Sequence, residues 1–466
     1  MVRPFLSLSA LVLLAGCTGG AASPGRGSSP ERAALIARID SIVMAPISAG
    51  KAAGAGVAVV KGADTILIKG YGKADLEFDI AMPDDAMFEI GSVTKQFTAV
   101  AIMQLVEQGK LSLDDDLTKF FPDYPVRGQK IPVRRLLDHT SGIKGYTEIP
   151  EFGTLRALKK SKDTLVTIFS RYPFDFAPGD AEIYNNSAYF LAGMIIEKVS
   201  GMSYADYVQK NLFDNVGMSR SRYCSENAIV ERRAHGYDAA DSGKLVRAAY
   251  LDHTWPYAAG SLCSTPGDLV KWNQALHGGK VLSADSYAEL IKPDALNDGT
   301  VLRYAKGLAL VPLAGRRAIW HDGGINGFIS LNRWIPDDSL SVIVLWNSTG
   351  GDLDVGEKIV EAVLGPVPAE TATFGGSLED YTGAWAGKGR GRPMEVVVAA
   401  EGGKLTLKQA QGQDKPDTLT FVSGDTWRAG GMVVTFGRTN GKADRLRMDA
   451  GYLNVELGRK TGAMAN

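Results

Sequence analysis

The sequence has little cysteine or histidine, and its charges almost cancel. Only three of its 466 residues are cysteine and five are histidine, and 51 basic residues oppose 52 acidic ones for a net charge of -1. A balanced charge argues against a nucleic-acid-binding surface and against a polybasic face for a membrane. The composition, 45% hydrophobic and 22% charged, is typical of globular proteins, and the length allows two or three domains.

Several motifs of known chemistry are also missing. The sequence contains no G-x-S-x-G, the turn that presents the serine of α/β-hydrolases. It contains no H-E-x-x-H, no C-x-x-C and no G-x-x-x-x-G-K-[ST]. We therefore expect no metal site, no phosphate-binding loop and no cofactor.

The N-terminus predicts export. In MVRPFLSLSALVLLAGCTGG, one Arg precedes an apolar stretch that is too short to span a bilayer and is typical of a secretory signal. LAGC resembles a bacterial lipobox, in which Cys17 becomes the lipidated first residue, while a plain signal peptide cut nearby is the alternative. A lipid anchor would place the protein on the cell envelope, facing the periplasm. Thr18 in place of Asp favours the outer membrane over the inner one.

The remaining cysteines are Cys224 and Cys263. In an oxidising compartment they could form a disulfide, worth about 3–4 kcal/mol on loop-entropy grounds. Spacing alone does not fix their geometry, so two unpaired thiols are the alternative.

Hydrophobic patterns predict an α+β domain followed by a small β domain. A hairpin, a helical middle, further strands and a closing helix predict one antiparallel sheet whose two sequence halves meet, covered by helices. Alternating patterns with Gly-rich turns then predict a small antiparallel β domain of barrel type. The expected helices are 30–43, 186–201, 265–279 and 354–365, and the expected strands are 56–60, 65–70, 302–311, 316–324, 327–335 and 340–348. The expected segments are a signal peptide at 1–17, a tether at 18–31, the α+β domain at 32–365, a linker at 366–376 and the β domain at 377–460.

The pattern S-x-x-K occurs three times, and one copy stands out. Ser48–Lys51 and Ser141–Lys144 lie among glycines and open no helix. Ser92–Lys95 opens an apolar run over 97–106 that predicts a helix buried nearly all round. One helical turn separates Ser92 from Lys95, so both side chains lie on one face.

A serine and a lysine at this place suit nucleophilic catalysis. The N–H groups at a helix start can help to hold an oxyanion, so the Ser92 N–H is a candidate donor. The helix dipole and burial disfavour the charged form of Lys95 and lower its pKa, which lets the amine accept the serine proton. The alternative is a serine cap with a surface lysine.

With this helix the sequence resembles the serine β-lactamase and penicillin-binding-protein superfamily, in the branch with class C β-lactamases, D-alanyl-D-alanine carboxypeptidases and related esterases. The resemblance covers roughly residues 33 to 365. It rests on GSVTKQFTAVAIMQLVEQGKLSLDD, LLDHTSG, FAPGDAEIYNNSAY and WHDGGINGF. It implies a β-lactamase/transpeptidase-like fold, with an antiparallel sheet flanked by helices and a helical subdomain.

Members of this family carry Y-x-N after S-x-x-K, and the sequence holds two copies. Tyr184–Asn186 precedes a helix in the helical middle, where the family places the motif. Tyr452–Asn454 lies in an alternating segment of the β domain, and we interpret it as packing or solvent-facing surface.

The third family motif is K-T-G or H-x-G on an edge strand. The K-T-G at 460–462 has only four residues after it, and His277–Gly279 ends a helix. His321–Gly323 follows one predicted strand and precedes two others, so we choose it; an ordinary histidine at a strand end is the alternative.

The resemblance assigns the catalytic roles. Ser92 resembles the acylated nucleophile, and Lys95 and Tyr184 share the work of the general base and titrate as a unit. Asn186 matches the amide that binds the substrate side-chain carbonyl. The N–H groups of Ser92 and Gly324 would form the oxyanion hole.

Other positions have weaker assignments. His321 would face the substrate carboxylate or assist proton transfer, and Gly323 would keep the strand bare beside the substrate. Asp322 departs from the usual Thr or Ser and could repel an anionic substrate. We interpret Asp138 and His139 as structural residues at a turn.

Together these motifs imply a serine hydrolase that works through a Ser92 acyl-enzyme. A D-alanyl carboxypeptidase, another D-amino-acid peptidase or an esterase is favoured, with a small-molecule or peptide substrate. The alternatives are a β-lactamase and a non-catalytic penicillin- or ligand-binding envelope protein. The expected partners include the membrane, through the lipid anchor, and no nucleic acid.

Overall fold

The computed structural model describes residues 29–224, 227–240, 243–367, 372–389, 392–410 and 415–460. Cys17, with the predicted signal and most of the tether, lies outside the described residues, as do Thr461 and Gly462. Within the described ranges, no helix combines the length and the apolar character needed to cross a membrane.

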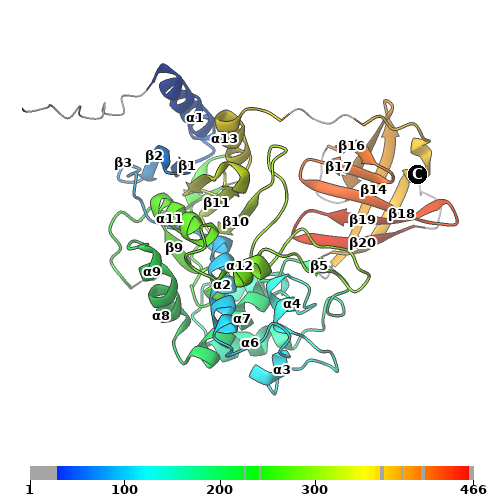
Figure 1. Ribbon diagram of the computed structural model, residues 1–466, viewed down its shortest axis with the longest axis horizontal. Helices are drawn as coiled ribbons and strands as arrows, with labels where there is room; N and C mark the ends of the chain where they lie inside the picture. The colour runs from blue at the N-terminus through cyan, green and yellow to red at the C-terminus, as the bar shows by residue number, and fades with distance from the viewer. Residues whose placement is uncertain are drawn as a thin grey trace, which may run out of the picture.

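A six-stranded antiparallel sheet joins early and late parts of the chain (Figure 1). β1 pairs with β2 on one side and with β12 on the other, so Val57 stands opposite both Lys69 and Val344. This confirms the predicted sheet whose sequence halves meet. In spatial order its strands are β10 (Ile319–Ile325), β11 (Phe328–Ile335), β12 (Leu340–Trp346), β1 (Gly54–Lys61), β2 (Asp64–Asp75) and β3 (Ile80–Ala81).

Helices cover both faces of this sheet. Val57 and Val59 share one buried cluster with the helices α1 (Pro30–Ser48) and α13 (Val355–Leu364). Ala58 belongs to a second cluster on the opposite face, together with the helices α2 (Thr94–Glu107) and α11 (Pro266–His277). Neighbouring residues of β1 serve different cores because side chains alternate along a strand.

One predicted strand is wrong. Residues 302–311 form no strand, and only isolated bridges join Tyr304 to Ala309 and Ala309 to Trp320. Gly307 has a φ of +76°, which turns the chain back on itself and interrupts an extended conformation. The apolar residues here line the sheet edge instead of extending it.

The helical region surrounds α2, which is buried on nearly every side. Its Phe97 ring contacts Trp272, with ring centroids 4.1 Å apart, and Phe213 at 5.4 Å. The helices of this region are α2 (Thr94–Glu107), α3 (Leu117–Phe120), α4 (Val133–Leu137), α5 (Phe152–Leu155), α6 (Lys162–Ser170), α7 (Asn186–Ser200), α8 (Tyr204–Val208), α9 (Asp214–Val216), α10 (Tyr257–Gly260), α11 (Pro266–His277) and α12 (Ala284–Leu290). Short strands nearby are β4 (Phe88–Glu89), β6 (Arg222–Tyr223), β7 (Tyr237–Ala239), β8 (Leu245–Arg247) and β9 (Leu262–Ser264).

The C-terminal strands form a closed, eight-stranded barrel, which confirms the predicted β domain. Each strand pairs antiparallel with the next, and a pairing of β13 with β20 closes the ring. The strands are β13 (Gly383–Gly389), β14 (Arg392–Glu401), β15 (Lys404–Gln409), β16 (Asp417–Ser423), β17 (Thr426–Ala429), β18 (Met432–Thr439), β19 (Lys442–Asp449) and β20 (Leu453–Arg459).

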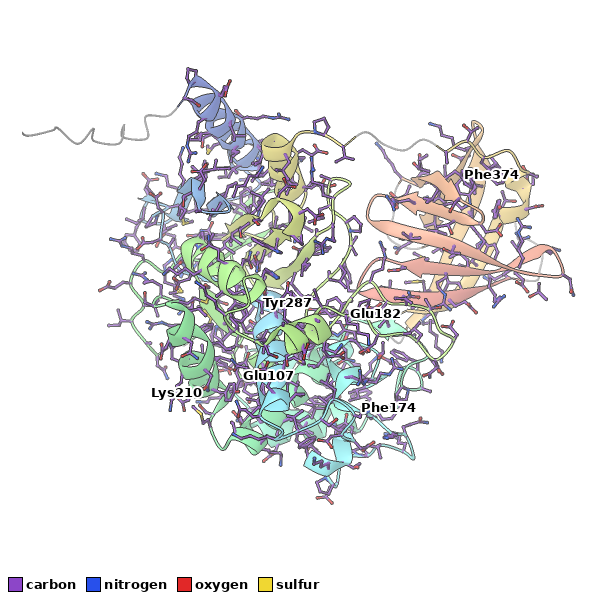
Figure 2. The ribbon with its side chains drawn as sticks, viewed as in Figure 1. Glu107, Phe174, Glu182, Lys210, Tyr287 and Phe374 are labelled. Atoms are coloured by element: carbon purple, nitrogen blue, oxygen red, sulfur yellow. A yellow bond between two sulfur atoms is a disulfide. The ribbon has the colours of Figure 1, made fainter. Side chains whose placement is uncertain are left out.

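The barrel is joined to the helical region by a shared strand. β5 (Glu182–Ile183), just before Tyr184, pairs with β20 through Ile183 and Leu453. Glu182 is fully buried at this junction, where Figure 2 labels it. Burial raises the pKa of its carboxyl well above the usual range. The barrel is thus held directly against the Tyr184 motif.

Candidate active site

Ser92 lies in a short 3-10 turn, η1 (Gly91–Val93), that runs into α2. Gly91 has a φ of +48°, and a Cβ there would stand 2.9 Å from the carbonyl oxygen of Gly324. Glycine therefore lets the serine turn lie directly against β10. This close approach brings the backbone of Gly324 beside the nucleophile.

Lys95 is fully buried and makes three contacts through its amine. Its Nζ lies 3.2 Å from Ser92 Oγ, 2.7 Å from Asn186 Oδ1 and 2.8 Å from the carbonyl oxygen of Ala259. Burial lowers the pKa of Lys95 well below its ordinary value of 10.5. The charged form is therefore strongly disfavoured.

The three contacts fix the direction of the amine. A neutral amine has two N–H donors and one lone pair. The two carbonyl oxygens, of Asn186 and Ala259, can only accept, so they take the two N–H groups. The lone pair then faces Ser92 Oγ, the one partner with a proton to give. Lys95 is oriented as a base toward Ser92.

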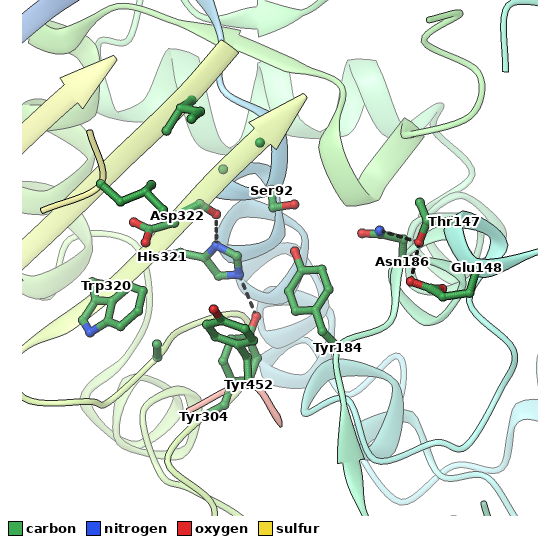
Figure 3. Close-up of a pocket in the computed structure, with 15 residues that line it drawn as sticks. Ser92, Thr147, Glu148, Tyr184, Asn186, Tyr304, Trp320, His321, Asp322 and Tyr452 are labelled. Atoms are coloured by element: carbon green, nitrogen blue, oxygen red, sulfur yellow. Dashed lines mark hydrogen bonds between the residues drawn. The ribbon is translucent and has the colours of Figure 1, made fainter. Parts of the chain in front are cut away.

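Tyr184 and Asn186 stand between β5 and α7. Asn185 caps α7, since its side chain accepts from the Ala188 N–H, and this cap directs its two neighbours into the site. Lys95 Nζ lies 4.6 Å from the centroid of the Tyr184 ring. Figure 3 shows the Tyr184 hydroxyl pointing toward Ser92. The structure thus brings Ser92, Lys95, Tyr184 and Asn186 together.

His139 supports Tyr184 from behind. Its ring lies 4.4 Å from the Tyr184 ring, centroid to centroid, and its Nδ1 accepts a hydrogen bond from the Asn185 N–H. His139 has a φ of +64°, in the left-handed region that residues other than glycine rarely adopt. The backbone at this turn therefore has an uncommon conformation. Asp138 is buried beside it, and burial raises the pKa of its carboxyl to about 6. Both residues position the site from outside the cavity.

His321 is buried and electrically neutral. Burial is the main reason that its pKa falls to about 3. Its Nδ1–H donates to the Asp322 carbonyl oxygen, and its Nε2 accepts from the Tyr304 hydroxyl at 2.9 Å. Both nitrogens are therefore engaged by the protein. The expected role of His321 in facing a substrate carboxylate is not supported, because the ring carries no charge to offer.

Asp322 is paired with Arg333. Two guanidinium nitrogens of Arg333 contact the two carboxylate oxygens of Asp322, one of them at 3.0 Å, and the Arg333 side chain is only 5% exposed. The guanidinium also stacks 4.4 Å from the Trp320 ring centroid. The expectation that Asp322 repels anions is corrected, since Arg333 balances its charge.

The two glycines of β10 have different surroundings. A Cβ on Gly323 would stand 2.1 Å from the Ile90 carbonyl oxygen and 2.2 Å from Ser330 Oγ. A Cβ on Gly324 would meet no atom within 4 Å. Gly323 is therefore required by the packing of β10 against the serine turn. We expected Gly323 to leave the strand bare beside the substrate, but Gly324 is the glycine of this pair that faces open space.

These residues surround a cavity of about 560 Å³ (Figure 3). Ser92, Tyr184, Asn186 and His321 line it, together with Glu148, which belongs to none of the sequence motifs, and Tyr452, from the Y-x-N copy that we assigned no catalytic role. The only charged carboxylate side chains among its described lining residues are Glu148 and Asp322, and no lysine or arginine is among them.

Tyr452 is the main difference from the sequence interpretation. It lies just before β20, and its carbonyl oxygen accepts from the Tyr184 N–H at 3.2 Å. Its ring meets the Tyr184 ring edge to face, with centroids 6.1 Å apart. We interpreted Tyr452 from the sequence as packing or solvent-facing surface, and the residue is 40% exposed; the sequence did not show that it also lines the catalytic cavity.

A disulfide joins Cys224 to Cys263 across 39 residues of sequence. Cys263 lies in β9, the strand that follows the Ala259 carbonyl on which Lys95 rests. Over the described part of the chain, no cluster of three or more His, Cys, Asp or Glu side chains is placed to bind a metal.

Comparison with known proteins shows clear likenesses. A family model described as Beta-lactamase matches residues 39–364. A D-aminopeptidase of Brucella anthropi is 28% identical over 446 residues, which cover 83% of this chain and 82% of that protein.

Two solved structures extend the comparison. A D-amino acid amidase from Ochrobactrum anthropi SV3, complexed with L-phenylalanine amide, has a TM-score of 0.62 and 27% identity, over 71% of this chain and 98% of the amidase. The octameric penicillin-binding protein homologue from Pyrococcus abyssi has a TM-score of 0.63 at 24% identity, over 90% of this chain and 99% of its own. The second likeness concerns the fold alone, and together they confirm the predicted β-lactamase/transpeptidase-like fold.

Proposed function

This protein belongs to the Beta-lactamase family, and we propose that it uses a Ser92 acyl-enzyme to release an N-terminal D-amino acid from a peptide or amide. That the chain is a serine hydrolase is established by its family and relatives. The D-aminopeptidase and D-amino acid amidase among the relatives support the choice of substrate.

The charged side chains that line the cavity are the main support for an aminopeptidase over a carboxypeptidase. A carboxypeptidase must bind the terminal carboxylate of its substrate, and this requires a cation. Glu148 and Asp322 are the charged residues among the described lining residues of the cavity, and Asp322 is already balanced by Arg333. Glu148, which accepts a hydrogen bond from the Thr147 hydroxyl, places a carboxylate in the cavity wall that suits the free α-ammonium of an aminopeptidase substrate.

The polar groups beside Glu148 complete this end of the cavity. The Thr147 hydroxyl donates to Glu148 Oε1 at 2.9 Å, and the Asn186 amide donates to Thr147 Oγ1 at 3.4 Å. Figure 3 shows these three side chains together on one side of Ser92 and Tyr184. The substrate amino acid would lie here, with its α-ammonium toward Glu148.

In the proposed acylation step, the Lys95 amine acts as the base because its lone pair faces Ser92 Oγ. Lys95 takes the Ser92 proton as Oγ attacks the substrate carbonyl, and the N–H groups of Ser92 and Gly324 bind the oxyanion. Tyr184 then gives its proton to the leaving nitrogen as the C–N bond breaks, and Lys95 returns a proton to Tyr184. Water attacks the ester in the reverse sense and regenerates Ser92.

The test compares substrates that differ in one group. We expect the protein to hydrolyse D-phenylalaninamide, to act far more slowly on L-phenylalaninamide and N-acetyl-D-phenylalaninamide, and to lose activity in Ser92→Ala. Glu148→Gln should lower kcat/KM on D-phenylalaninamide about tenfold, while Glu151→Gln, at a neighbouring acidic residue outside the cavity, should not. Preference for the N-acetylated substrate, or rapid hydrolysis of penicillin, would refute the aminopeptidase assignment.

We also propose that the protein is exported and anchored by lipid at Cys17, as LAGC suggests. Palmitate labelling of the wild type in a bacterial host, and its loss in Cys17→Ser, would support this. Unlabelled protein in the periplasmic fraction would instead indicate a plain signal peptide.

A further inference from the structure

A second cavity continues the active site between the two domains. It has a volume of about 490 Å³, and it shares Trp320, Asp322, Leu353 and Tyr452 with the catalytic cavity. These shared residues place the two cavities next to each other, and the second is a groove lined by both the catalytic domain and the barrel. We call this second cavity the interdomain groove.

Both walls of the interdomain groove are held in place. On the catalytic side, Trp320 Nε1 donates to the Val311 carbonyl oxygen at 2.8 Å. Across the groove, Arg303 donates to Asp449 Oδ2 at 2.7 Å and to the Gly431 carbonyl oxygen at 3.0 Å, which ties the barrel turn to the catalytic domain. The groove is a fixed feature of the domain contact.

The chemistry of Tyr184 decides which part of a substrate would enter the groove. Tyr184 protonates the leaving nitrogen in the proposed mechanism, so the leaving group departs past this ring. The Tyr184 ring packs against Tyr452, which lines both cavities. Figure 3 shows Tyr452, Asp322 and Trp320 on the opposite side of Tyr184 from Glu148. The leaving group therefore faces the interdomain groove.

The groove offers one cation for a ligand. Of its arginines, Arg303 pairs with Asp449 and Arg333 pairs with Asp322. Arg428, on β17, is exposed and has no ion-pair partner within the described residues. The barrel thus supplies a positive charge at the far wall.

Besides Asp322, two further carboxylates line the groove, those of Asp354 and Glu357. Glu357 Oε1 accepts from the Ala314 N–H at 2.7 Å. The hydrogen bond to Asp352 is the main reason that the pKa of Lys358 is raised, and the charge of Asp354 adds a smaller contribution. The side chains of Val311 and Met432 add apolar surface. The groove therefore has a mixed polar and apolar lining, and Arg428, which has no ion-pair partner within the described residues, suits the terminal carboxylate of a short peptide.

We propose that the interdomain groove binds the leaving portion of a peptide substrate, with its C-terminal carboxylate toward Arg428. This rests on the proposed function and deepens it, because it makes the natural substrate a D-aminoacyl peptide rather than a simple amide. The barrel then acts as part of the substrate-binding site.

The test uses peptides with and without a terminal charge. D-alanyl peptides of two to five residues are compared with the same peptides as C-terminal amides, in the wild type and in Arg428→Gln. At one or more lengths the wild type should prefer the free acid, and Arg428→Gln should reduce that preference by about threefold to fivefold, the range of an exposed ion pair. Arg445→Gln, on the same barrel but outside both cavities, should preserve it. No preference at any length, or equal loss in both arginine variants, would overturn the proposal.

A second variant tests occupation of the groove without removing a charge. A Cβ on Gly431 would have Val311 Cγ1, at 3.8 Å, as its nearest neighbour, so a larger side chain can extend across the groove. Gly431→Trp should lower kcat/KM for the longer peptides more than for D-alaninamide. An equal effect on peptide and amide would contradict a leaving-group subsite.

A binding measurement separates this proposal from the proposed function. Calorimetry on Ser92→Ala, which cannot form the acyl-enzyme, measures the Kd of each peptide without turnover. Tighter binding of the free acid that weakens in Ser92→Ala/Arg428→Gln supports the groove even if D-aminopeptidase activity is not found. Equal Kd values for acid and amide would refute the groove even if the activity is present.

Discussion

Lys95 Nζ lies 3.2 Å from Ser92 Oγ while its other two contacts are carbonyl oxygens. This geometry supports the proposed proton transfer, because the serine hydroxyl is the one group among these three contacts that can give a proton to a neutral amine. Burial lowers the pKa of the Lys95 amine and so favours its neutral form, and the same burial makes the residue costly for the fold.

Lys95→Arg tests whether activity needs a side chain that can lose its proton, because arginine is also long and cationic. Lys95→Arg should abolish activity, by at least about a thousandfold, because a guanidinium remains protonated and cannot act as a base. The pH profile of the wild type should show kcat/KM falling as the pH drops through the lowered pKa of Lys95. Retention of activity in Lys95→Arg, measured on D-phenylalaninamide, would contradict the assignment.

Lys95→Met should stabilise the protein while abolishing activity. The unfolded lysine keeps its proton up to about pH 10.5, and the folded one loses it at lower pH, so the unfolded state binds more protons in that window and stability rises with pH. At pH 7 the methionine variant should gain roughly 1–3 kcal/mol in urea denaturation. A lower stability at pH 7 would mean that Lys95 is not buried as a neutral amine.

Removal of the Asp322 charge should expose a cation to the cavity. Asp322→Asn leaves the Arg333 guanidinium, with its 5% exposed side chain, without its counter-ion, so we expect a loss of roughly 2 kcal/mol or more. The freed charge should also speed acylation by penicillin, which carries a carboxylate, by about tenfold. The matched variant Asp322→Asn/Arg333→Met should lose this gain. If the single variant labels no faster than the wild type, Arg333 does not govern carboxylate recognition.

The adjacent glycines of β10 provide a matched pair of substitutions. Gly323→Ala should destabilise the protein by about 2–4 kcal/mol and lower activity, since its Cβ meets the Ile90 carbonyl oxygen at 2.1 Å. Gly324→Ala, whose Cβ meets no atom within 4 Å, should change stability by less than about 0.5 kcal/mol. Thermal unfolding of both variants checks this. The reverse order would show that β10 lies differently against the serine turn.

Loss of the disulfide should lower stability more than activity. Cys224 and Cys263 close a loop of 39 residues, for which chain entropy predicts about 4 kcal/mol. Cys224→Ala/Cys263→Ala should show this loss in urea denaturation under oxidising conditions. A stability equal to that of the wild type would argue that the two thiols are not bonded in the native protein.

The sequence was sufficient for the parts of the site that depend on local geometry. Ser92 and Lys95 lie one helical turn apart, and Tyr184 and Asn186 sit at the capped start of α7. These short spacings place side chains through the shape of one helix, so a motif can identify them. Their convergence, in contrast, was expected from the family resemblance.

Arg333 could have been found with one further step. The hairpin between β10 and β11 pairs Asp322 with Leu331 and Trp320 with Arg333. Arg333 is therefore a diagonal neighbour of Asp322 on the same face of the sheet. Counting the register outward from the turn at Asn326–Gly327 would have placed the two charges together.

Tyr452 had no such signal. Its place in the cavity depends on the pairing of β20 with β5, two strands separated by most of the helical region and by the barrel itself. Local alternation in the barrel gives no information about which of its loops contacts another domain. The lowered pKa of His321 was equally hidden, because it depends mainly on how deeply the folded protein buries the ring.

The most direct test of the account is the site of covalent labelling. The protein and its Ser92→Ala variant are treated with a serine-directed phosphonate and analysed by intact mass and peptide mapping. We predict one adduct in the wild type, on the peptide that contains Ser92, and none in the variant. An adduct that persists in Ser92→Ala, or an unlabelled wild type, would contradict the assignment of Ser92 as the nucleophile.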